Sequence, residues 1–131
     1  MVCNNIMVID DSRFDRLIAQ KVIELAGASL HITLMESGPR ALAFLGSEPS
    51  DPGVPELIFL DISMPGMDGF EFLESFALLP ERVRSACRVI MLSSSVNPAD
   101  ILKAQKSNFV RGFIAKPLCR EKLQACLDQI A

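Results

Sequence analysis

The chain has 131 residues, half of them apolar, and its 13 Lys and Arg against 16 Asp and Glu give a net charge of −3. This length fits one domain, residues 1–131, and we expect no separate catalytic or output domain. The dispersed charge forms no basic stripe, which argues against direct DNA binding, and no apolar run approaches the roughly 20 residues of a membrane helix.

The N-terminal segment leads directly into an apolar run at 6–9, without the basic, hydrophobic and small-residue regions of a secretory signal. We therefore expect a soluble, cytoplasmic protein. After this first predicted strand, Ser12 and Asp15 have the spacing of an N-cap and the third position of a helix, and Gly27 is a typical stop. The expected buried face of this helix contains Phe14, Leu17, Ile18, Val22, Leu25 and Ala26.

Four further strand-like runs follow at 30–35, 57–60, 88–92 and 112–115, separated by helical patterns. A second helix is predicted from Pro39 after Ser37, ending in the polar loop 46–55, and a third begins at Asp68. The segment 80–87 extends the third helix or adds a turn. A fourth helix begins at Asn97 and Pro98, and the last has its buried stripe at Leu118, Leu123, Cys126, Leu127 and Ile130. This alternation predicts an α/β fold with five parallel strands and five helices.

Chemical groups follow four of the predicted strands. Asp10 and Asp11 come after the first, Asp61 after the third, Ser93 after the fourth and Lys116 after the fifth. Because parallel strands end at a common edge, we expect these groups to converge there. Three acids with a hydroxyl and an ammonium are typical of a site for a divalent metal and phosphoryl transfer.

The order of these groups closely resembles the receiver domain of two-component response regulators. The resemblance rests on the pair DD at 10–11, DISMPGMDG at 61–69, SSS at 93–95 and KP at 116–117, and it covers essentially the whole chain. It implies a flavodoxin-like, doubly wound sheet of order 2-1-3-4-5, an order for which the chemotaxis receiver CheY is a standard example.

The resemblance also implies a role for each site residue. Asp61 is the expected phosphoacceptor, and Asp10, Asp11 and Asp61, with the backbone carbonyl of Ser63, are the expected ligands of Mg²⁺. A carboxylate attacking a phosphoryl group needs nearby cations, because both carry negative charge. The sequence does not rank Asp10 against Asp11 as the direct ligand.

Ser93 is implied to be the switch hydroxyl and Lys116 the lysine that contacts the phosphoryl group, with Pro117 in a cis peptide bond after it. Phe113 occupies the position of the aromatic residue that follows the movement of the switch hydroxyl. Phenylalanine has no hydroxyl with which to form an outward hydrogen bond.

The predicted function is that of a stand-alone phosphoacceptor, not an enzyme. It takes a phosphoryl group from a phosphohistidine on a sensor histidine kinase or phosphotransfer protein. It then signals to an unknown downstream protein through the fourth helix, fifth strand and fifth helix. Two alternatives stay open: a small hydrolase of the aspartyl-phosphate type, which would need a second acid where Ser63 stands, and a receiver-like interaction domain that acts without phosphorylation.

The cysteines and the one histidine are given structural roles. Cys3, Cys87, Cys119 and Cys126 form no C-x-x-C pair, so we expect reduced and mostly buried thiols. His31 lies in a strand-like run and is expected to be partly buried. Cys119 stands at the cap position of the last helix, where a thiol is a poor acceptor.

Overall fold

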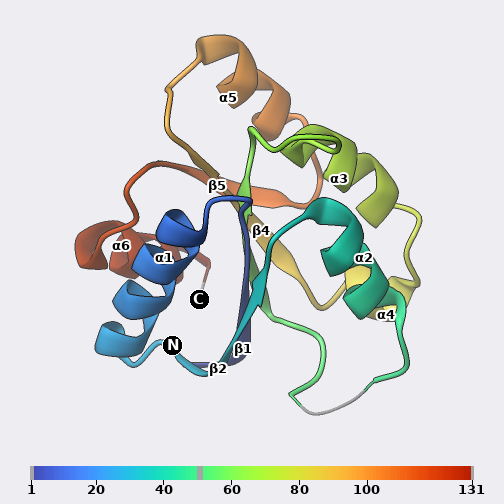
Figure 1. Cartoon of the computed structure of the whole chain (residues 1–131), viewed down its shortest axis with the longest axis horizontal. Coiled ribbons are helices and arrows are strands. Elements are labelled where there is room, and N and C mark those ends of the chain that lie inside the picture. Colours follow the sequence, from blue (N-terminus) through green and yellow to red (C-terminus); the bar gives the residue numbers. More distant parts are fainter. Residues whose placement is uncertain (1, 50–51, 131) are drawn as a thin grey trace.

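The structure is a computed structural model that describes residues 2–49 and 52–130, so residues 50 and 51 of the predicted loop lie outside the described residues. Five parallel strands form one sheet in the order β2-β1-β3-β4-β5 (Figure 1). The strands are β1 (Cys3–Ile9), β2 (Ser29–Met35), β3 (Leu57–Asp61), β4 (Arg88–Ser93) and β5 (Val110–Ala115). The predicted flavodoxin-like sheet and its strand order are confirmed.

The helices of the described ranges are α1 (Arg13–Ala26), α2 (Gly38–Gly46), α3 (Gly69–Phe76), α4 (Glu81–Arg84), α5 (Pro98–Gln105) and α6 (Arg120–Ile130). Five of them match the prediction, and α4 is an additional helix of four residues in the segment 80–87. Pro80 separates it from α3, because proline disfavours helical backbone at the residue before it. None of the helices described is long and apolar enough to cross a bilayer.

Helices cover both faces of the sheet and enclose two hydrophobic clusters (Figure 1). Alternate residues of β1 divide between them, since Met7 and Ile9 pack toward α2, α3 and α5, whereas Ile6 and Val8 pack toward α1 and α6. Burial on both faces explains why the central strands are continuous apolar runs. The carboxyl ends of these strands form a polar edge, and the candidate functional site lies there.

The helix boundaries follow the predicted local signals. Ser12 caps α1 by accepting from the amide of Asp15, and Gly27 ends that helix in the left-handed conformation, with φ of 61°. Asp68 caps α3 in a complete capping box, and the side chain of Asn97 accepts from the first turn of α5. These caps fix where each helix begins relative to the strand end before it.

The predicted buried face of α1 is partly wrong. Phe14, Leu17 and Leu25 are 72%, 47% and 72% exposed, while Ala19 and Ile23 are the residues buried against the sheet. Apolar residues occupy more than one face of this helix, but the sheet lies on only one side of it. Periodicity alone did not show which apolar face packs inward.

The expectation for the cysteines is confirmed and that for the histidine is wrong. Cys3, Cys87 and Cys126 are buried, Cys119 is partly buried, and all four are free thiols. Burial raises the pKa of the Cys87 thiol to about 12, which keeps it protonated and unreactive. His31 is exposed because β2 is an edge strand of the sheet.

Candidate functional site

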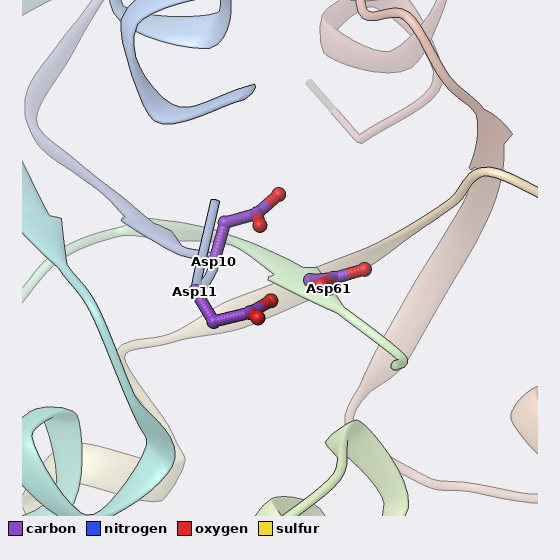
Figure 2. Close-up of side chains that lie close together, drawn as sticks. All are labelled: Asp10, Asp11 and Asp61. Carbon is purple, nitrogen blue, oxygen red and sulfur yellow. The ribbon is translucent and has the colours of Figure 1, made fainter. Parts of the chain in front are cut away.

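Three carboxylates converge at the carboxyl ends of β1 and β3. Ile9 and Leu60 are paired in register, so Asp10 and Asp61 follow them at adjacent strand ends. One oxygen each of Asp10, Asp11 and Asp61 lies within 4.8 Å of the others, and Figure 2 shows the three side chains grouped at this edge. Asp10 and Asp61 are 1% and 4% exposed, and Asp11 is open to solvent.

The loop after Asp61 is held tightly against the strand end. The amide of Gly69 donates to the carbonyl of Ile62 over 2.8 Å. A Cβ on Gly69 would lie 2.7 Å from the carbonyl oxygen of Asp61, so only glycine lets α3 approach this closely. Within the loop, Gly66 has φ of 79°, a conformation that other residues rarely adopt. The loop thereby fixes the backbone that carries Asp61.

Lys116 reaches the acids from the end of β5. Its backbone amide donates to the carbonyl of Ser93 over 2.7 Å, which ties the ends of β4 and β5 together. Its Nζ lies 2.7 Å from Asp10 Oδ2 and 3.3 Å from Asp61 Oδ1. The Lys116–Pro117 peptide bond is cis, as the resemblance implied. The structure therefore brings the predicted acids and the lysine into one site.

A fourth carboxylate belongs to this site and was missed from the sequence. Asp15 Oδ2 lies 2.8 Å from Lys116 Nζ, although 101 residues separate the two in the chain. Its position in the first turn of α1 indicated only a helix start. A direct signal for this contact is absent from the sequence, because it arises when α1 packs beside the end of β5.

Negative charge exceeds positive charge among the described residues of the site. Asp10, Asp15 and Asp61 lie within 3.3 Å of Lys116 Nζ, and Asp11 lies beside Asp10 and Asp61. The second cation is Arg16, whose guanidinium donates to the backbone carbonyl of Asp10 over 2.7 Å. Burial, together with repulsion from Asp10 and Asp11 and despite attraction by Lys116, raises the pKa of Asp61 to about 6. Burial alone would lower the pKa of Lys116, but hydrogen bonds to Asp10 and Asp15 outweigh it, and its pKa lies above the ordinary value. The site thus carries an excess of negative charge, and a further cation bound there would reduce the repulsion among its carboxylates.

The other predicted residues lie around this centre. Ser93 is 4% exposed, and its hydroxyl donates to the carbonyl of Ser95 over 2.6 Å and accepts from the amide of Ser95 over 3.2 Å. Phe113 is partly buried against the cluster that includes Ala104 of α5. Ser63 is exposed two residues after Asp61. The roles given to Ser93, Phe113 and Ser63 stay predictions.

The acidic triad has the composition of a site for a hard divalent cation. Its donors are carboxylate oxygens, with neither sulfur nor imidazole among them. Such oxygen sets suit Mg²⁺ or Ca²⁺ rather than softer transition metals. A cation here would offset the charge excess that raises the pKa of Asp61.

Comparisons with known proteins agree with this geometry. The family model described as "Response regulator receiver domain" matches residues 6–128. A curated relative, the "Probable methanogenesis regulatory protein FilR2" of Methanothrix harundinacea, is 29% identical over 126 residues, which cover 95% of this chain and 79% of that protein. The chain spans about half or less of other curated relatives that it matches, 52% of one and 16% of another.

Solved structures show the same fold. A two-component response regulator from Cytophaga hutchinsonii superposes with a TM-score of 0.90 at 26% identity, covering 99% of this chain and 98% of that one. The CheX-CheY-BeF3-Mg²⁺ complex from Borrelia burgdorferi gives a TM-score of 0.77 at 24% identity, covering 98% and 90% of the two chains. At this lower identity the likeness concerns the fold alone.

Proposed function

Because the chain belongs to the response regulator receiver domain family, we propose that it accepts a phosphoryl group on Asp61 and signals by changing its surface. The family consists of signalling modules rather than enzymes. The observation that carries the proposal is the placement of a buried carboxylate beside two further acids and within 3.3 Å of a lysine. This is the arrangement that phosphoryl transfer to a carboxylate requires.

The proposed reaction is an in-line displacement at phosphorus. A carboxylate oxygen of Asp61 forms the new P–O bond while the P–N bond of a phosphohistidine breaks, and the imidazole nitrogen keeps the electron pair. Lys116 donates to an oxygen of the transferring group. Its ammonium already lies at the acid, so little reorganisation is needed.

The proposed cofactor is Mg²⁺, held by Asp10, Asp11 and Asp61 with the backbone carbonyl of Ser63. The bound ion would supply positive charge at the phosphoryl oxygens. The carboxylate set of this chain supports the proposal, as does the similar fold of the CheX-CheY complex from Borrelia burgdorferi, which contains BeF3 and Mg²⁺. The ion would also lower the pKa of Asp61 and keep the attacking carboxylate charged at neutral pH.

The proposed switch is a change of hydrogen-bond acceptor by Ser93. Its hydroxyl donates to the carbonyl of Ser95, and on phosphorylation it would donate to a phosphoryl oxygen instead. That exchange would draw the loop before α5 toward Asp61 and bias the position of Phe113. Differential contacts to the phosphoryl group would thus shift the protein between two states.

The proposed partners follow from this chemistry. A sensor histidine kinase or a histidine phosphotransfer protein would supply the phosphoryl group, and a downstream protein would recognise the surface formed by α5, β5 and α6. We propose no direct contact with DNA, because the chain carries a net charge of −3. The cytoplasmic location stays a prediction from the sequence.

Intact-mass spectrometry after incubation with acetyl phosphate tests the proposal. We expect a gain of one phosphoryl group that requires Mg²⁺ and is lost in Asp61→Asn. The control is Asp128→Asn, which removes an exposed acid of α6 and should be labelled like the native chain. Unchanged labelling of Asp61→Asn would refute Asp61 as the acceptor, and no labelling of the native chain would favour an interaction domain that acts without phosphorylation.

A further inference from the structure

Asp15 does not make the contact that its position in α1 suggests. An acid three residues after an N-cap typically accepts from the cap amide, as it does in the complete capping box of α3. In α1 the amide of Ser12 instead donates to Asp10 Oδ1 over 2.9 Å. The carboxylate of Asp15 is thereby left for Lys116, whose Nζ donates to it over 2.8 Å.

Lys116 has three N–H donors, and the structure shows how they are divided. Two point to Asp10 and Asp15, at 2.7 and 2.8 Å. The third contact, from Lys116 Nζ to Asp61 Oδ1, is longer, at 3.3 Å. The ammonium is thus held by short contacts to two acids, while its contact with the proposed phosphoacceptor is longer.

The two anchoring acids differ in their surroundings. Asp10 has a side chain only 2% exposed and belongs to the triad that could hold a metal ion, whereas the Asp15 side chain is 34% exposed and lies outside that triad. A cation in the triad would compete with Lys116 for Asp10. Asp15 would then be the one of the two anchoring acids that the cation does not bind.

We propose that Asp15 is a positioning residue for Lys116, holding its ammonium beside Asp61 when the metal ion occupies the acidic triad. This inference rests on the proposed phosphoacceptor function. Asp15 touches neither the phosphoryl group nor the metal. It restricts Lys116 to the orientation in which a free N–H donor faces the incoming phosphoryl oxygen.

The first test measures phosphorylation by acetyl phosphate at saturating Mg²⁺ in the full chain. We expect Asp15→Asn to slow the reaction about three- to fivefold, the range of a partly exposed ion pair. Asp15→Glu should recover most of the rate, since it restores the carboxylate. Glu24→Gln, which removes an exposed acid near the other end of α1, should react like the native chain. A rate for Asp15→Asn equal to or above that of the native chain would overturn the proposal.

A double-mutant cycle separates positioning from a general effect on the fold. If Asp15 acts through Lys116, then Asp15→Asn should have no further effect on the rate in the Lys116→Ala background. An equal loss in both backgrounds would contradict the proposal. Thermal melting of each variant shows whether it remains folded under the assay conditions.

A third measurement reads the contact without any phosphoryl transfer. Acetic anhydride labels free amines, so peptide mapping should show faster acetylation of Lys116 in Asp15→Asn than in the native chain or in Glu24→Gln. Equal acetylation would refute the anchoring role. If Asp15→Asn accelerates acetylation but the native chain takes up no phosphoryl group, the contact exists and the phosphoacceptor function, with this role, is wrong.

Discussion

Replacing Asp61 with asparagine is expected to stabilise the fold at neutral pH, although it removes the proposed phosphoacceptor. The side chain is 5% exposed and lies among the carboxylates of Asp10 and Asp11. Asparagine has nearly the same shape and no charge, and its amide can donate to Asp10 while its oxygen still accepts from Lys116. Repulsion at the site is therefore replaced by hydrogen bonding.

The magnitude follows from the pKa of Asp61, which rises from 3.8 to about 6. One pKa unit corresponds to about 1.36 kcal/mol, so the charged carboxylate costs the folded state about 3 kcal/mol. For a chain of this size, that difference is worth about 10 °C in melting temperature.

The pH dependence has a definite sign. The pKa is higher in the folded state, so between about pH 4 and pH 6 the folded protein binds more protons than the unfolded chain, and this group's contribution to stability falls as the pH rises. The gain from Asp61→Asn should be complete above about pH 6.5 and absent below about pH 4.

Urea denaturation of the native chain and Asp61→Asn, at pH 4 and pH 7.5 without divalent cations, checks this reasoning. Glu74→Gln, an exposed acid of α3, is the control and should show no comparable gain. Mg²⁺ should stabilise the native chain far more than Asp61→Asn, because it binds the folded triad. A destabilised Asp61→Asn at pH 7.5, or an equal gain at both pH values, would show that charge crowding does not set the energy of this site.

Three further substitutions test single features of the structure. Ser93→Ala should cost about 1 kcal/mol in urea denaturation, because the hydrogen bonds to Ser95 are lost, yet it should still accept a phosphoryl group; failure of labelling would contradict a switch role. Gly69→Ala should cost about 1–3 kcal/mol, since its Cβ would lie 2.7 Å from a backbone oxygen, whereas Gly46→Ala has room and should cost little; equal costs would refute the close-packing argument. Cys119→Ser should be neutral or stabilising by up to about 1 kcal/mol, because a hydroxyl caps α6 better than a thiol; a clear drop in melting temperature would contradict this.

Features carried by neighbouring residues were predictable from the sequence. Ser12 and Gly27 mark the ends of α1, and Asp68 begins α3, because a cap needs only a side chain and amides a few residues away. The parallel sheet was equally predictable, since strands buried on both faces are continuous apolar runs. Once these runs were placed in parallel, Asp10 and Asp61 had to meet at one edge.

Features that depend on packing were decided by the tertiary structure alone. The exposed position of Phe14 depends on which face of α1 meets the sheet, and the additional helix α4 depends on how the chain passes Pro80. The contact between Asp15 and Lys116 joins residues 101 positions apart, through the packing of α1 beside the end of β5. Local sequence determines caps and periodicity because their partners are close in the chain, whereas the orientation of a helix and the choice of a distant ion pair are set by the packing of the whole domain.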